Sequence, residues 1–178
     1  MKWITLVLFG IGLIFAGIFG VTLFLNGNEN NSATAETSIF YNDQIPANIK
    51  LYDIDDNLID LSGFIGQPIL INFWATWCTP CTEEIPLLIS YSEKYPQLMI
   101  IGISSYESHS TVDKFIKNIP IPYLILLDSE GKIADQFKIV GYPTSFFVDT
   151  EGKLQSTHLG QLDASLLDNY LAQIGITP

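Results

Sequence analysis

The feature that most constrains the fold is an apolar stretch that runs directly into a pair of cysteines. Residues 68–74 read PILINFW, and residues 75–81 read ATWCTPC. An apolar run of this length predicts a strand that is covered on both faces. In the segment that follows, residues 79–95, Ile85, Leu88 and Ile89 recur at helical spacing, and Pro86 interrupts them. The only two cysteines of the chain therefore lie where a buried strand gives way to a helix.

Strand and helix patterns alternate through the rest of the chain. Residues 48–61 predict a hairpin, and residues 98–104 and 123–128 predict two further strands. Residues 110–119 and 132–137 predict helices between them, and residues 141–160 predict two strands joined by a turn. A last amphipathic helix begins at the cap Asp163 and ends at Gly175. This order predicts an α/β fold with a mixed sheet flanked by helices.

The N-terminal part of the chain has a different character. Residues 3–25 carry no charge and would span roughly 34 Å as a helix, enough to cross a bilayer. Because Lys2 precedes this run, the positive-inside rule leaves the N-terminus in the cytoplasm and the remainder outside. We expect a single transmembrane anchor at 1–25, a flexible linker at 26–40 and one domain at 41–178. A cleaved signal peptide is the alternative, since residues 33–35 read ATA.

The charge of the chain excludes one class of partner. Its basic residues are eight lysines, with no arginine, against 19 acidic residues, and the formal net charge is −11. Nucleic-acid binding needs clustered positive charge to neutralise phosphates, so we expect no nucleic-acid partner. Acidity also disfavours a surface that lies on anionic lipid, so membrane contact must come through the N-terminal helix.

The cysteine pair itself predicts redox chemistry. The unpaired N–H groups at the start of a helix stabilise a thiolate, so Cys78 is expected to be an exposed, ionisable nucleophile. Cys81, one turn later, is expected to point inward and to resolve the mixed disulfide that Cys78 forms. Pro80 stiffens the first turn between them. A redox-active Cys78–Cys81 disulfide would need no other cofactor.

Three alternative roles for the cysteine pair stay open. A purely structural disulfide would close a four-residue loop and would constrain little of the unfolded chain. A zinc site would need four ligands, and His109 and His158 lie at unsuitable spacing, so we predict no metal. Two unreactive buried thiols are the third alternative. Thiol–disulfide exchange is favoured over all three.

Three segments together resemble a known family. NFWATWCTPCTEEIP, GYPTSFFVD and EGKL…HLG are similar, in order and spacing, to the membrane-tethered, extracytoplasmic thioredoxin-like proteins of the TlpA/ResA type. The resemblance implies a thioredoxin-like fold and thiol–disulfide exchange with exported proteins, such as apocytochrome c, fed by a membrane thiol electron donor. A disulfide oxidant or isomerase of the same fold is the alternative. A peroxiredoxin-like peroxidase is disfavoured because such enzymes place an arginine beside the thiolate, and this chain has no arginine.

The resemblance also assigns residues to substrate docking. Pro143 matches a cis-proline that lies against the cysteine pair and leaves a backbone edge for a substrate strand. A trans-proline at a strand start is the alternative. Trp77 matches a docking surface, Trp74 is equally consistent with the core, and Tyr142 stands where an aliphatic or small residue is usual.

A buried acid is the last implication. Asn72 stands where cytoplasmic thioredoxins carry a buried aspartate, so this chain needs another proton acceptor. Glu84, three residues after Cys81, matches an acidic position of the extracytoplasmic reductases, although a solvated helix carboxylate is the alternative. Glu83 is expected on the surface. Thr79 and Pro80 add no positive charge to stabilise a thiolate, which favours a reductant of low potential.

Overall fold

The computed structural model describes residues 44–46 and 49–177. The predicted anchor at 1–25 and linker at 26–40 lie outside the described residues, and the predicted domain start at residue 41 does too. Among the residues that the structure describes, none of the helices has the length and apolar character needed to cross a membrane.

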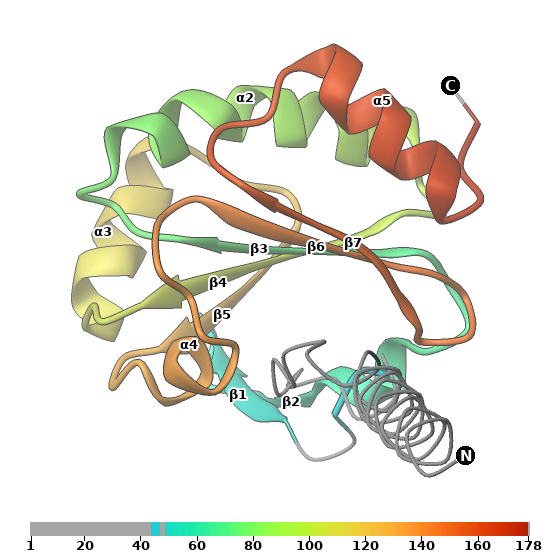
Figure 1. Cartoon of the computed structure of the whole chain (residues 1–178). Coiled ribbons are helices and arrows are strands. Elements are labelled where there is room, and N and C mark those ends of the chain that lie inside the picture. Colours follow the sequence, from blue (N-terminus) through green and yellow to red (C-terminus); the bar gives the residue numbers. More distant parts are fainter. Residues whose placement is uncertain (1–43, 47–48, 178) are drawn as a thin grey trace, which may run out of the picture. The chain divides into compact units, whose positions relative to one another are not determined.

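A seven-stranded mixed sheet forms the centre of the domain, with the strand order β2-β1-β5-β4-β3-β6-β7 (Figure 1). Strands β3, β4 and β5 are parallel to one another, and every other neighbouring pair is antiparallel. The predicted mixed sheet is therefore confirmed. The strands are β1 (Lys50–Asp53), β2 (Leu58–Asp60), β3 (Ile69–Trp74), β4 (Met99–Ser105), β5 (Leu124–Asp128), β6 (Thr144–Val148) and β7 (Leu154–Leu159).

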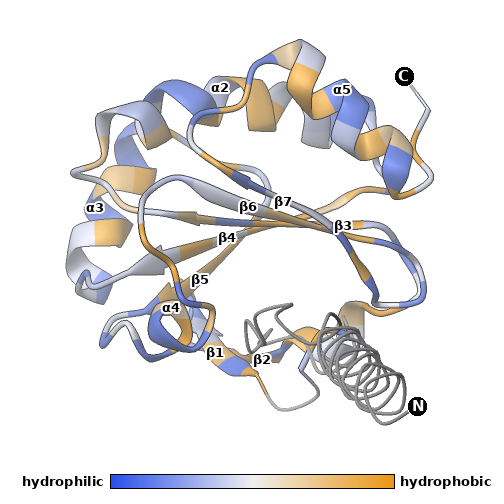
Figure 2. Cartoon of the chain, viewed as in Figure 1, coloured by the Kyte–Doolittle hydropathy of each residue, from blue (hydrophilic) through white to orange (hydrophobic). Residues whose placement is uncertain are grey.

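Helices cover both faces of this sheet. Helices α2 (Thr79–Lys94), α3 (His109–Asn118) and α5 (Ala164–Gln173) pack on one face. The short α4 (Lys132–Gln136) and the 3-10 turn η1 (Leu61–Phe64) pack on the other, as Figure 1 shows for α4. Apolar residues gather in the strands and on the helix faces turned toward them, while polar residues face outward (Figure 2). This is the two-faced burial expected of a strand such as β3.

Strand β3 lies between β4 and β6, and all six of its residues are buried. Because side chains alternate along a strand, Ile69, Ile71 and Phe73 enter the core beneath α4. Leu70 and Trp74 enter the two clusters on the face that carries α2. Asn72, between them, must also point toward α2. The position of this polar residue under the helix sets up the site described next.

The predicted elements agree with the structure to within a few residues at each end. Ser108 caps α3 and Asp163 caps α5 by accepting a backbone N–H, that of Leu166 at 2.8 Å in the second case. The turn η1 was not predicted, because four residues carry no measurable period. Of the two histidines, His109 contacts the carbonyl of Ile54 at the surface, and His158 lies on β7 against Tyr170.

Candidate active site

The cysteine pair occupies the N-terminus of α2. Cys78 is the N-cap residue, and its Sγ accepts the backbone N–H of Cys81 at 3.3 Å. The Cα atoms of the two cysteines are 5.3 Å apart and their sulfurs form a disulfide. Pro80 lies in the first turn, where its missing N–H costs no helical bond. On reduction, the N–H of Cys81 and the other unpaired N–H groups at the start of α2 favour a Cys78 thiolate.

The predicted exposure of Cys78 is wrong for this oxidised form. Cys78 is 6% exposed and Cys81 is 2% exposed, so both sulfurs are largely covered. Cys78 and Cys81 belong to a buried cluster with Trp74, Val112 and Ile125, the last two from other parts of the chain, so no local pattern could reveal this burial. Cys78 nevertheless lines an open groove, whereas Cys81 does not.

The groove beside Cys78 has a volume of about 550 Å³. None of its lining residues is charged: they are Trp77, Cys78, Thr79, Pro80, Tyr106, Ile139, Val140, Gly141 and Tyr142. Trp77 is 62% exposed, and its ring meets that of Tyr142 edge to face, with 5.7 Å between centroids. Trp74, by contrast, is buried against Phe115. The structure thus brings both predicted docking aromatics into one groove with Cys78, the predicted nucleophile.

Gly141 and Tyr142 line the same groove as Cys78, and Pro143 follows them in the chain. The Tyr142–Pro143 peptide bond is cis, and Pro143 is buried. The carbonyl of Pro143 accepts the N–H of Gly160, and the carbonyl of Gly141 accepts the hydroxyl of Thr144. Within the described residues, the backbone N–H and C=O of Tyr142 bond to no other backbone group. These two groups, on either side of the Tyr142 Cα, can pair with an extended substrate segment.

Glu84 is a residue of α2 whose carboxylate is buried on the inner side of the helix. It is 1% exposed, so the alternative of a solvated helix residue is wrong. Its Oε1 accepts from Asn72 Nδ2 at 2.8 Å, and its Oε2 accepts the backbone N–H of Leu162. Asn72 also donates to Ser145 at 3.0 Å. Burial raises the pKa of Glu84 from 4.5 to about 7, against the opposing effect of the bonds from Leu162 and Asn72.

A second buried acid, Glu107, escaped prediction. It accepts the backbone N–H of Thr76 at 2.7 Å and the hydroxyl of Ser104 at 3.0 Å, and it also bonds the Thr76 hydroxyl. These bonds fix the loop that leads from β3 to Cys78. The one signal in the sequence is an acid just past the C-terminal end of a buried strand, the edge at which open α/β sheets place their sites.

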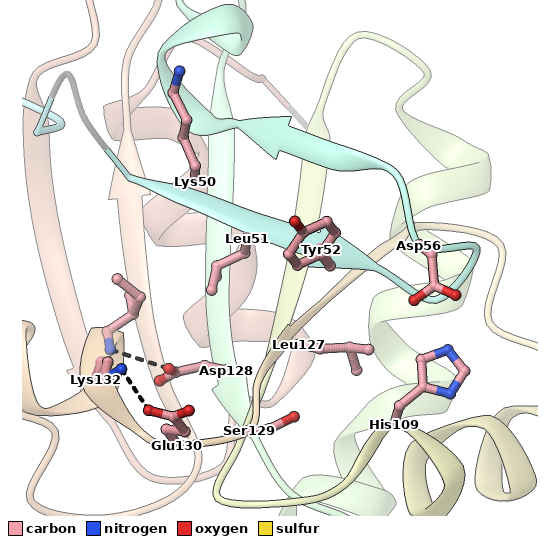
Figure 3. A pocket seen from close by; sticks show the side chains of 11 residues that line it. Lys50, Leu51, Tyr52, Asp56, His109, Leu127, Asp128, Ser129, Glu130 and Lys132 are labelled. Atoms are coloured by element: carbon pink, nitrogen blue, oxygen red, sulfur yellow. Dashed lines mark hydrogen bonds and ion pairs between the residues drawn. The ribbon is translucent and has the colours of Figure 1, made fainter.

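Other parts of the described chain offer little for a metal or a second site. No group of three or more histidine, cysteine, aspartate or glutamate side chains in residues 44–46 and 49–177 could hold a metal ion. A second hollow of about 440 Å³ lies between β1, β5 and the start of α4 (Figure 3). Its charges are largely paired within the chain, Lys132 with Glu130 at 2.5 Å and Lys50 with Asp60 at 3.4 Å. Neither cysteine lines it.

Comparison with known proteins agrees with this geometry. The model of the AhpC/TSA family matches residues 41–157, about two thirds of the chain. The chain belongs to this family. Among its relatives, thiol-disulfide oxidoreductase ResA of Bacillus thuringiensis is 29% identical over 164 residues, which cover 91% of each chain. The chain is therefore a thiol-disulfide oxidoreductase, as shown by its family, its Cys78–Cys81 disulfide and its similarity to ResA.

Solved structures of similar proteins have the same fold. A putative thiol:disulfide interchange protein DsbE from Chlorobium tepidum superposes with a TM-score of 0.69 at 26% identity, over 75% of this chain and 97% of that one. StoA from Bacillus subtilis gives a TM-score of 0.61 at 26% identity, over 71% and 99%. The thioredoxin-like fold and the resemblance to the TlpA/ResA type are thereby confirmed.

Proposed function

We propose that the chain is a membrane-anchored reductant of disulfides in exported proteins. Residues 1–25 form the anchor, and residues 41–178 act on the extracytoplasmic side of the cell membrane. Apocytochrome c, which presents two cysteines before haem attachment, is the proposed substrate in cytochrome c maturation. A membrane thiol carrier supplies the electrons.

The observation that carries the reductant role is the absence of positive charge around the pair. Within the described residues, no lysine or histidine lines the groove beside Cys78. Strong oxidants stabilise their reduced thiolate and reach reduction potentials of about −120 mV, whereas thioredoxin-type reductants have potentials of about −270 mV. Here the Cys78 thiolate is stabilised by the N-terminus of α2, and the carboxylate of Glu84, one turn beyond Cys81, opposes ionisation of the pair. The lack of a positively charged side chain among the described residues of the groove and the nearby carboxylate of Glu84 both disfavour the thiolate, and therefore favour the disulfide and a low potential.

The proposed reaction has two exchange steps. The Cys78 thiolate attacks one sulfur of the substrate disulfide, that disulfide breaks, and the other substrate sulfur leaves as a thiolate. Glu84 then accepts the proton of Cys81, whose thiolate attacks Cys78 Sγ and releases the substrate as a dithiol. Two electrons pass from the cysteine pair to the substrate. A carboxyl group with a pKa of about 7 is suited to this transfer at neutral pH.

Equilibration of the full-length protein with a dithiothreitol redox couple tests the direction of exchange. We expect a midpoint potential near about −270 mV. A midpoint above about −200 mV would assign the oxidant or isomerase role instead. In a Cys81→Ser variant, Cys78 should form a stable mixed disulfide with the substrate, and Cys78→Ser should form none.

Membrane attachment needs a separate experiment. We expect the full chain to sediment with membranes and to require detergent for release, with the domain open to protease from outside the cell. A chain without residues 1–25 serves as the control and should stay in the cytoplasm. Recovery of a soluble chain that begins near Glu36 would favour the cleaved signal peptide.

A further inference from the structure

Tyr106, the residue after β4, has an unusual backbone conformation. Its φ is +61°, in the left-handed region that non-glycine residues rarely adopt. Its backbone N–H bonds the carbonyl of Asp128 at 3.0 Å, which ties the end of β4 to the end of β5. The side chain is 51% exposed, so burial of the ring does not account for this conformation. Strained residues of this kind concentrate at functional sites.

The ring of Tyr106 is nevertheless held in place by α4. The hydroxyl donates to Asp135, and this bond raises the pKa of Tyr106 to about 12, so the hydroxyl remains a donor at neutral pH. The ring lies directly on Gly131, because a Cβ built on that glycine would be 1.9 Å from Tyr106 Cε1. A polar bond at one end and a glycine beneath it give the exposed ring a fixed position.

The position of this ring matters because it forms a wall of the groove that contains Cys78. Trp77 and Val140 also line the groove, and Val140 is 87% exposed. Leu159 is exposed beside them, since its Cδ1 lies 3.2 Å from the site of a Cβ on Gly141. We call these four residues the apolar rim. Exposed apolar groups gathered in one place usually mark a surface that a partner covers.

We propose that Tyr106 is a specificity-determining residue, which selects substrates that carry a large apolar side chain next to the reacting cysteine. This inference rests on the exchange reaction at Cys78. Because Cys78 lies in the same groove, the occupant is the substrate segment that flanks its cysteine. The groove carries no charged side chain although the chain has a net charge of −11. Recognition is therefore by apolar burial rather than by ion pairs.

Mixed-disulfide peptides test this selection. Each peptide carries one cysteine bonded to 5-thio-2-nitrobenzoate, and the peptides differ in one flanking residue, which is leucine, alanine or aspartate. In the reduced full-length Cys81→Ser chain in detergent, the Cys78 thiolate attacks the peptide sulfur. The peptide–nitrobenzoate disulfide breaks, the coloured thiolate leaves, and the peptide remains bonded to Cys78. Each rate is divided by the rate of the same variant with 2-hydroxyethyl disulfide, which has no flanking residue.

We expect the leucine peptide to react about tenfold faster than the alanine peptide, the discrimination that a hydrophobic pocket gives. Tyr106→Gly, which removes the ring and suits the positive φ, should reduce this ratio about fivefold or more. Tyr106→Phe should keep most of the ratio, and Asp135→Ala, which releases the ring, should lower it. Tyr52→Ala, at an exposed tyrosine of β1 outside the groove, is the matched control and should leave it unchanged.

A ratio that stays within about twofold of the original in Tyr106→Gly would overturn the proposal, as would an original ratio near one. If Tyr106→Gly does not fold, Asp135→Ala decides, and an unchanged ratio in that variant overturns the proposal. Failure of the unaltered reduced chain to react with 2-hydroxyethyl disulfide would instead refute the exchange reaction. The two failures are therefore distinguishable.

Discussion

Among single side chains, Glu84 has surroundings that alter its chemistry at neutral pH. It is buried beneath α2, three residues beyond Cys81, and Asn72 and the Leu162 N–H bond its oxygens. We expect Glu84→Gln to slow the attack of Cys81 on a Cys78 mixed disulfide by about a hundredfold, since a positioned base contributes at least that much. The measurement is the release of a small thiol from the mixed disulfide at a series of pH values. An inflection near pH 7 should disappear in the variant, whereas the exposed neighbour Glu83→Gln should retain it.

The same carboxyl group makes stability depend on pH. The pKa of Glu84 is raised from 4.5 in the unfolded chain to about 7 in the folded one, so the folded state binds the proton more tightly. The contribution of Glu84 to the free energy of unfolding is therefore fully present below pH 4.5. It is lost as pH rises through about 7, which lowers the free energy of unfolding by about 3 kcal/mol in total. Glu84→Gln should remove this part of the pH dependence and should be the more stable form at pH 8. Urea unfolding at several pH values checks this, and parallel curves for both proteins would contradict it.

Glu107 holds the loop before Cys78 through three bonds to Thr76 and Ser104. Glu107→Gln replaces an oxygen acceptor by an N–H₂ donor, so one buried donor must lose its partner. We expect a loss of about 1–3 kcal/mol in the free energy of unfolding. A double-mutant cycle with Thr76→Val should show a coupling of about 0.5–3 kcal/mol, because the two residues share these bonds. Strict additivity would mean that the loop is held by other contacts.

Among the helices and strands, α5 has a role that its sequence does not reveal. The N–H of Leu162, just before the cap Asp163, bonds Glu84, so the start of α5 completes the surroundings of the buried acid. Asp163→Ala should cost about 1 kcal/mol of stability, as the loss of an N-cap does. It should also raise the pKa of Glu84 further, because the bond from Leu162 lowers that pKa.

The matched control for Asp163→Ala is Ser108→Ala, which removes the cap of α3. It should cost a similar amount of stability and leave the titration of Glu84 unchanged. Calorimetric or urea unfolding gives the stabilities, and carbon NMR of the carboxyl group gives the pKa. Equal pKa values in the two variants would show that the start of α5 does not act on Glu84.

The elements and the site differ in how far sequence could predict them. The strand at β3 and the helix at α2 follow from runs of residues that each carry their own pattern, so local reasoning was sufficient. Glu107 reaches Thr76 across 31 positions, and Tyr106, at the end of another strand, lines the same groove as Cys78. Such placements depend on which strands become neighbours in the sheet. The hydrophobic periodicity within one segment does not indicate strand order.

For the domain taken together, the N-terminal boundary is a prediction that can be measured. Ile45 and Ile49 are buried in the same core cluster as Leu61 and Phe73, so the fold includes residues that precede β1. A chain that begins at Lys50 should be less stable than one that begins at residue 41, by at least about 2 kcal/mol, because it loses two buried isoleucines. Urea unfolding of the two fragments measures this difference. Equal stabilities would place the functional boundary of the domain after residue 49.

The location of the disulfide within a single turn links redox potential to folding through a thermodynamic cycle. Cys78 and Cys81 are three positions apart at the start of α2, outside the seven-stranded sheet, so we expect the reduced form to keep the same core. The disulfide can close in the folded chain or in the unfolded chain, and each closure has its own free energy. The closure free energy in the unfolded chain minus that in the folded chain equals the unfolding free energy of the oxidised form minus that of the reduced form. About 30 mV corresponds to about 1.4 kcal/mol for a two-electron couple. For a reductant, the oxidised domain must be the more stable form, so two unfolding curves measured without any substrate give its potential relative to that of the unfolded cysteine pair.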